Sequence, residues 1–164
     1  AVVLNGSATD QELLLDENGD LPYDYKCYVF GGKLHFIAVT YNRRIHNNEQ
    51  QFDSLWFDKH WNPIKYPMIK KGYKYSNIKK PDALDKLVLL VENMGKLLKR
   101  HCRIDVYVID NKIYLGEFTF FCGAILHTRL CNLILGCIWK LNPDDYNHFD
   151  KNLLKLVPEY YNKP

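Results

Sequence analysis

The stretch Arg103-Ile104-Asp105-Val106-Tyr107, followed by Tyr114-Leu115-Gly116-Glu117-Phe118-Thr119, decides how this chain is interpreted. In the first part apolar and polar residues alternate, which is typical of a strand that is buried on one side. In the second part, Tyr114, Phe118 and Phe120 are expected to supply the matching apolar face. The two parts therefore predict a β-hairpin that carries acidic side chains on its outer face.

The turn of this hairpin sets which side chains meet. A three-residue loop at 109–111, with Asn111 at positive φ, is expected to place Glu117 across from Arg103 and diagonal to Asp105. Two carboxylates that converge in this way repel each other, and Mg²⁺ with nucleotide phosphates is one remedy. An ordinary hairpin with a charged outer face is the simpler alternative.

Periodicity and turn residues predict further elements. Strands are expected at 25–30 and 33–40 around Gly31-Gly32, a third strand at 51–57, and a helix at 81–99. The complete order is three strands, a basic loop, the helix, the hairpin, an apolar segment and a short helix. The apolar stripe of the long helix is expected to pack on the sheet and consists of Leu84, Leu87, Val91, Met94 and Leu98.

Composition indicates a globular chain without naming its class. The 164 residues suit one domain, and 47% hydrophobic and 25% charged residues are average values. A net charge of +3 is too small to favour nucleic acid as the main partner. The five cysteines include no C-x-x-C pair, which indicates neither a disulfide framework nor a zinc site. Residues 1–15 lack a basic start and the longest apolar run, 130–139, is too short to span a bilayer, so a cytoplasmic location is expected.

Two segments leave their role open. The segment Ile64–Lys80 holds six lysines and no acid, interleaved with tyrosines, and fits a solvated loop, a polyanion-binding surface or a contact for an anionic sugar or polymer acceptor. The apolar segment 124–139 must be buried, either under the sheet, in a homo-oligomer or against a docking partner. Cys122, His127 and Cys131 could meet a metal, although buried reduced thiols are the simpler interpretation.

The hairpin resembles the metal-binding hairpin of the ATP-grasp superfamily, in which Arg-x-Asp is followed after a turn by Glu-x-Asn. An upstream stretch, Glu12–Lys26, resembles the hinge and next strand of the TupA-like ATP-grasp family, associated with teichuronopeptide and capsular polysaccharide synthesis. The resemblance covers about residues 11–123, with a weaker tail to about 149. Further similar stretches are Tyr25–Lys33, Phe52-Asp53, Lys80-Pro81-Asp82 and Asn142-Pro143-x-x-Tyr146.

This resemblance implies an α+β fold, namely an ATP-grasp-like C-terminal subdomain with a mainly antiparallel sheet packed by helices. It implies ATP and Mg²⁺ as cofactors, with Arg103 as the catalytic residue that faces the phosphates or an acyl phosphate. Thr119 stands where the superfamily usually has Asn. The implied metal ligands are Asp105, Glu117 and Thr119, and the implied nucleotide contacts are Glu12, Leu14, Leu15, Asp24 and Lys26.

The implied function is a carboxylate–amine ligase of polysaccharide or cell-surface polymer biosynthesis. ATP-grasp enzymes usually carry a substrate domain and a Gly-rich phosphate loop before the hinge, and only about ten residues precede it here. Residues 1–164 are therefore expected to be one ATP-grasp-like domain without those parts, with Lys26 or Lys33 as candidates for the phosphate-binding lysine. An incomplete or non-catalytic nucleotide-binding module, or a polyanion-binding protein that uses Lys65–Lys80, remain alternatives, so enzymatic activity stays open.

Overall fold

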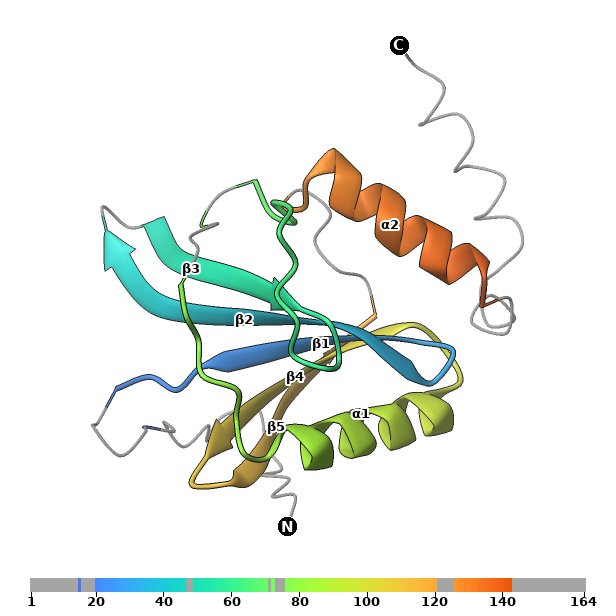
Figure 1. Ribbon diagram of the computed structural model, residues 1–164, viewed down its shortest axis with the longest axis horizontal. Coiled ribbons are helices and arrows are strands. Elements are labelled where there is room, and N and C mark those ends of the chain that lie inside the picture. Colours follow the sequence, from blue (N-terminus) through green and yellow to red (C-terminus); the bar gives the residue numbers. More distant parts are fainter. Residues whose placement is uncertain are drawn as a thin grey trace.

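The computed structural model describes residues 15, 20–46, 49–70, 72, 76–120 and 126–142. Within this part of the chain, five strands form one antiparallel sheet in the order β3-β2-β1-β4-β5. The expected α+β class is confirmed, with a sheet and two helices (Figure 1). The elements are β1 (Asp24–Phe30), β2 (Lys33–His46), β3 (Glu49–Phe57), α1 (Leu84–Leu98), β4 (Cys102–Ile109), β5 (Lys112–Thr119) and α2 (Arg129–Lys140).

The sheet separates two apolar clusters, one on each face. Alternate residues of β1 divide between them, because successive side chains of a strand point to opposite faces. Tyr25, Cys27 and Val29 belong to the cluster that includes α1, whereas Tyr28 and Phe30 belong to the cluster that includes Cys131 of α2. In Figure 1 the two helices accordingly lie on opposite sides of the sheet.

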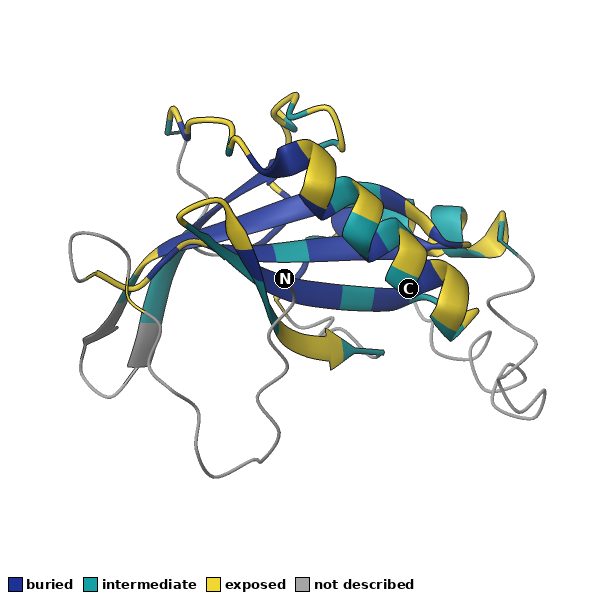
Figure 2. Cartoon of the chain, turned by 90° about the horizontal axis from the view of Figure 1, so that it is seen from below, coloured by how far each residue is buried: buried dark blue, intermediate teal, exposed yellow. Residues whose placement is uncertain are grey.

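Helix α1 packs as its sequence predicts. Leu84, Leu87 and Val91 are buried, and Met94 and Leu98 are partly buried against the same cluster. The other side of the helix faces solvent, as the exposed outer surface in Figure 2 shows. The apolar stripe of α1 therefore covers one face of the sheet, and α1 does not cover the opposite face of β1 and β4.

One glycine of α1 is required for this close packing. A Cβ at Gly95 would lie 2.4 Å from Cγ1 of Val29, a distance that side chains do not adopt. The helix thus rests almost directly on β1, beside the hairpin turn of Gly31 and Gly32, whose φ angles are 54° and 69°. That turn is the one predicted for the first hairpin.

The second hairpin has a different register from the predicted one. Its turn contains two residues rather than three, since Ile109 pairs with Lys112 and both Asp110 and Asn111 have positive φ angles of 50° and 57°. This is the backbone pattern of a two-residue turn that suits the twist of neighbouring strands. The predicted pairing of Glu117 with Arg103 is therefore wrong.

A β-bulge farther along the same hairpin changes which face of the sheet the later side chains of β5 point to. The register shifts between Asp105 and Val106, so that Gly116 is the extra residue and Asp105 pairs with Glu117. Before the bulge, Tyr114 pairs with Tyr107, so the prediction that Tyr114 faces the apolar core is wrong. Ile113 is the buried residue of that part of β5.

The apolar segment forms a helix itself, where a short helix was expected only after it. Thr128 caps α2, since its Oγ1 accepts a hydrogen bond from the backbone N–H of Cys131 at 3.1 Å. One side of α2 packs on the sheet through Cys131 and its neighbours, and the other exposes Leu130 and Leu133. No helix of the described residues is long and apolar enough to cross a membrane.

Candidate functional site

Polar side chains of three adjacent strands share the face of the sheet on which α2 lies. Lys26 of β1 pairs with Asp105 of β4, which pairs with Glu117 of β5. Directly paired residues project to the same side of an antiparallel sheet and lie about 5 Å apart. A second row next to this one runs through Tyr28, Arg103 and Thr119.

Asp105 lies at the centre of a network of ion pairs. Its side chain is only 4% exposed. Lys26 Nζ donates to Asp105 Oδ2 at 2.7 Å, and Arg103 donates through Nε to Oδ1 at 2.6 Å and through Nη2 to Oδ2 at 2.8 Å. Lys26 Nζ also lies 2.8 Å from Oδ2 of Asp24. Two cations therefore neutralise this buried carboxylate.

One nitrogen of Arg103 connects all three predicted metal ligands. Nη2 contacts Oδ2 of Asp105 at 2.8 Å, Oε1 of Glu117 at 2.8 Å and Oγ1 of Thr119 at 3.1 Å. The Thr119 hydroxyl in turn donates to Oε1 of Glu117 at 2.9 Å. The oxygen atoms of a carboxylate pair and a hydroxyl thus converge on one positively charged group.

Burial and charge oppose each other in Asp24 and Lys26. Burial raises the pKa of Asp24, and the nearby Lys26 and Arg43 reduce this effect without cancelling it. Burial would lower the pKa of Lys26, but the carboxylates of Asp24 and Asp105 outweigh it and the pKa is raised. Lys26 is therefore a fixed positive charge of this face at neutral pH.

The structure brings together six of the nine predicted site residues. They are Asp24, Lys26, Arg103, Asp105, Glu117 and Thr119, and they come from β1, β4 and β5. Leu15 is 43% exposed and makes no part of this network. Glu12 and Leu14 lie outside the described residues, so their predicted contacts with adenine stay predictions.

Three residues of this face were not singled out from the sequence as parts of the site. Arg43 lies 3.9 Å from Asp24, within a register shift of β2 between Tyr41 and Arg44 that no sequence signal indicated. The Tyr28 hydroxyl is 3.0 Å from Nε2 of His127, and Nδ1 of that histidine is 3.3 Å from Oδ1 of Asn132. Strand periodicity from Lys26 could have placed Tyr28 here.

The suggested meeting of Cys122, His127 and Cys131 at a metal finds no support in the described residues. Among them, no group of three or more His, Cys, Asp or Glu side chains could hold a metal ion. Cys131 is fully buried against the sheet, and Cys122 lies outside the described residues. Burial lowers the pKa of His127, which keeps its ring neutral, and the nearby Arg103 acts in the same direction.

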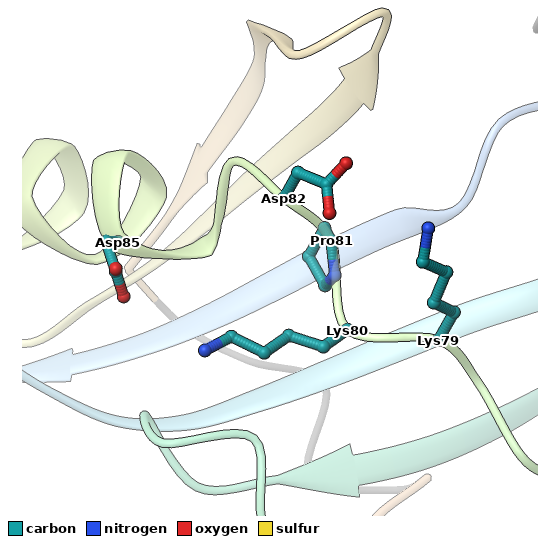
Figure 3. Close-up of a pocket in the computed structure, with 5 residues that line it drawn as sticks. All are labelled: Lys79, Lys80, Pro81, Asp82 and Asp85. Atoms are coloured by element: carbon teal, nitrogen blue, oxygen red, sulfur yellow. The ribbon is translucent and has the colours of Figure 1, made fainter.

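The basic segment contributes a separate pocket at the start of α1 (Figure 3). Its volume is about 420 Å³, and Lys79, Lys80, Asp82 and Asp85 line it together with Pro81. The two lysines extend in different directions, and two carboxylates share the same rim. This balance of charge does not resemble a surface built for a polyanion.

Comparison with known families identifies the family of this chain. The profile of the family described as TupA-like ATPgrasp matches residues 9–136, and the chain belongs to this family of ATP-grasp proteins. No curated protein matches the sequence.

One solved structure is similar over most of the chain. It is the crystal structure of D-alanine–D-alanine ligase from Bacillus anthracis, with 18% identity and a TM-score of 0.43. The similarity covers 85% of this chain and 42% of that ligase, so the chain spans less than half of the ligase's length.

Proposed function

We propose that this chain provides the nucleotide-binding face of an ATP- and Mg²⁺-dependent ligase that joins a carboxylate to an amine through an acyl phosphate. Membership of the TupA-like ATP-grasp family supports ATP-dependent ligation. The network centred on Asp105 supplies the charged groups that such a reaction needs, because phosphoryl transfer depends mainly on positioning and charge neutralisation.

The observation that carries this proposal is the convergence of three oxygen donors on Arg103 Nη2. Asp105, Glu117 and Thr119 all lie within 3.1 Å of that nitrogen. Mg²⁺ favours oxygen ligands and commonly takes one or two carboxylates together with substrate phosphates and water. The donor set therefore fits Mg²⁺, with Asp105 and Glu117 as the residues that would hold it. When bound, the ion would neutralise negative charge on the ATP phosphates.

Arg103 and Lys26 would act on the phosphates directly. Both are now held by Asp105, at 2.6 and 2.7 Å. With Asp105 and Glu117 holding Mg²⁺, the Arg103 guanidinium and the Lys26 amine would be available to phosphate oxygens. Metal and nucleotide should thus strengthen each other's binding, since such coupling is reciprocal.

The class of polymer follows only from the family, whose resemblance points to polysaccharide or cell-surface polymer biosynthesis with an anionic sugar or polymer acceptor. The second candidate function is a nucleotide-binding module without turnover, which uses the same face of the sheet. The two functions differ only in whether further groups complete this face for turnover. The polyanion alternative has less support, because Lys79 and Lys80 share their pocket with Asp82 and Asp85.

Calorimetric titration of a non-hydrolysable ATP analogue, with and without Mg²⁺, tests the nucleotide site. We expect Mg²⁺-dependent binding to the native chain and at least about tenfold weaker binding to Glu117→Gln, because one direct ligand is lost. Asp85→Asn, which removes an exposed carboxylate on α1, serves as the matched control and should bind as the native chain does. Equal affinity of Glu117→Gln and native protein would contradict the assignment of the metal ligands.

Turnover then separates the two candidate functions. ATP consumption that depends on a carboxylate and an amine identifies a ligase, whereas tight nucleotide binding without turnover identifies the module.

A further inference from the structure

A cavity of about 280 Å³ lies on the same face of the sheet, next to the charged network. Its floor consists of residues that pair across three strands. Asp24 pairs with Thr40, which pairs with Ser54, and the neighbouring row runs from Lys26 through Ala38 to Trp56. The small side chains in the middle of these rows leave space between larger neighbours.

Loop residues and aromatic rings close the walls of this cavity. Ile69 and Leu126 come from two segments that are joined by a backbone hydrogen bond of 2.9 Å between Lys70 N–H and the Leu126 carbonyl. His127 and Tyr28, which are linked by their own hydrogen bond, complete one side. The cavity therefore has a defined wall beside its floor.

Two buried polar atoms of residues that line this cavity have no hydrogen-bond partner among the described residues. They are the carboxylate atom Oδ1 of Asp24, a residue 5% exposed, and the indole nitrogen Nε1 of Trp56, a residue 1% exposed. Buried polar atoms are nearly always paired in folded proteins, and each exception requires an explanation. One free acceptor and one free donor beside the same cavity indicate a ligand that supplies a donor and an acceptor.

The charges around the cavity favour an amine as the ligand's donor. Lys26 and Arg103 line the cavity but are already paired with Asp105, and Arg43 lies 3.9 Å from Asp24. Oδ2 of Asp24 is paired with Lys26 at 2.8 Å, so the carboxylate atom that remains for a ligand is Oδ1, which accepts a hydrogen bond from an ammonium group and repels another carboxylate.

We infer that this cavity binds the amine substrate of the proposed ligation, a small molecule with a primary amine and an oxygen acceptor. Its amine meets Oδ1 of Asp24 and its oxygen accepts from Nε1 of Trp56. Asp24 then serves the amine substrate rather than the nucleotide, which the family resemblance implied as its ligand. The inference rests on the proposed function for the role of this ligand, while the binding itself can be tested alone.

The position of the cavity suits such a substrate. It lies over β1, β2 and β3, whereas the proposed metal ligands lie on β4 and β5. Lys26 and Arg103 belong to both sites and connect them. An amine in the cavity would therefore lie beside the place where the phosphates are expected.

Amino sugars and amino acids both combine an amine with oxygen acceptors, and calorimetry distinguishes the two sources. The probes are D-glucosamine and L-serine, with N-acetylglucosamine as the control that keeps the sugar ring and loses the amine. We expect one of the two amines to bind and N-acetylglucosamine to bind at least about tenfold more weakly. Equal binding of the sugar with and without its amine would overturn the inference, as would no binding of either amine.

Two variants test the location of the ligand. Ala38→Leu fills the floor of the cavity and Asp24→Asn removes the acceptor charge, so each should weaken amine binding at least about tenfold. Ala38→Val serves the same purpose if the larger side chain prevents folding, which thermal unfolding reports. Unchanged amine affinity in a folded Ala38 variant would overturn the assignment to this cavity.

Titration of the ATP analogue on the same proteins keeps the two proposals apart. Loss of amine binding in Ala38→Leu with intact Mg²⁺-dependent nucleotide binding supports both. Nucleotide binding without any amine binding by the native chain refutes the cavity assignment and leaves the proposed function. Amine binding without nucleotide binding refutes the proposed function and leaves the cavity as a binding site.

Discussion

Asp105 and Glu117 are paired across two strands, yet their removal should have very different effects on stability. Asp105→Asn takes the negative charge from a side chain that is 4% exposed and leaves Lys26 and Arg103 without their shared partner. Glu117→Gln changes a side chain that is 62% exposed and that contacts Arg103 at 2.8 Å. The comparison separates a structural carboxylate from one that serves mainly the ligand.

The expected magnitude follows from burial and from the partners that remain. Removing one member of a buried ion pair costs about 3–5 kcal/mol. Lys26 keeps Asp24, Arg103 keeps Glu117, and the Lys26 side chain is 25% exposed, so the cost should fall to about 2–3 kcal/mol. For a chain of this size that corresponds to a decrease in Tm of about 5–10 °C. An exposed pair contributes about 0–1 kcal/mol, so Glu117→Gln should lower Tm by no more than about 4 °C.

Urea and thermal unfolding, followed by tryptophan fluorescence at pH 7, measure both variants against the native chain. Asp105→Asn should move the urea midpoint strongly and Glu117→Gln only slightly. Equal destabilisation by the two substitutions would refute the reasoning, and so would an Asp105→Asn variant as stable as the native protein. In either case the ion pairs would not hold the three strands together as their geometry indicates.

Three further outcomes are expected. Gly95→Ala should destabilise the protein by about 1–3 kcal/mol because the added Cβ has no room. Gly136→Ala should stabilise α2 by up to about 1 kcal/mol, because no atom lies within 4 Å of its added Cβ. Urea unfolding measures both variants, and a stabilised Gly95→Ala would contradict the packing of α1 on the sheet. Tyr28→Phe should cost about 1–2 kcal/mol, since the buried Nε2 of His127 loses its hydrogen-bond partner, and an unchanged urea midpoint would show that this bond contributes nothing. Burial lowers the pKa of His101 from 6.5 to about 4. Between these pH values the unfolded chain binds a proton that the folded chain excludes. The free energy of unfolding should therefore be highest above pH 6.5 and should decrease by up to about 3 kcal/mol as the pH falls from 6.5 to about 4. His101→Gln should flatten the pH dependence of the urea midpoint, and an equally steep dependence would assign it to other groups.

The sequence allowed most of the fold to be predicted because its signals are local. Alternation in β4 and the helical stripe of α1 identify both the elements and their buried faces. The signal for α2 was also present, since Thr128 is a favoured N-cap residue in front of an apolar run. The apolar run by itself indicates only a segment that needs burial.

The composition of the site could be predicted only in part. Arg103, Asp105, Glu117 and Thr119 lie on one hairpin, so their nearness follows from local sequence. Lys26 reaches Asp105 across 79 positions of the chain because β1 lies next to β4, and strand order is a property of the complete sheet. His127 and Trp56 are brought to the cavity by such long-range packing, which no short motif encodes.

The β-bulge at Gly116 has a consequence for how this hairpin tolerates change in length. The bulge shifts the alternation of side chains in β5 by one residue. Residues after the bulge therefore point to the face opposite to the one they would have in a regular strand of the same length. Deleting Gly116 would restore a regular strand in which Glu117 directly follows Leu115, so Glu117 would still pair with Asp105 and Thr119 with Arg103. Relatives of this chain should therefore be compared by strand pairing rather than by counting residues from the turn, because a hairpin without the extra residue can hold its carboxylate in the same direction.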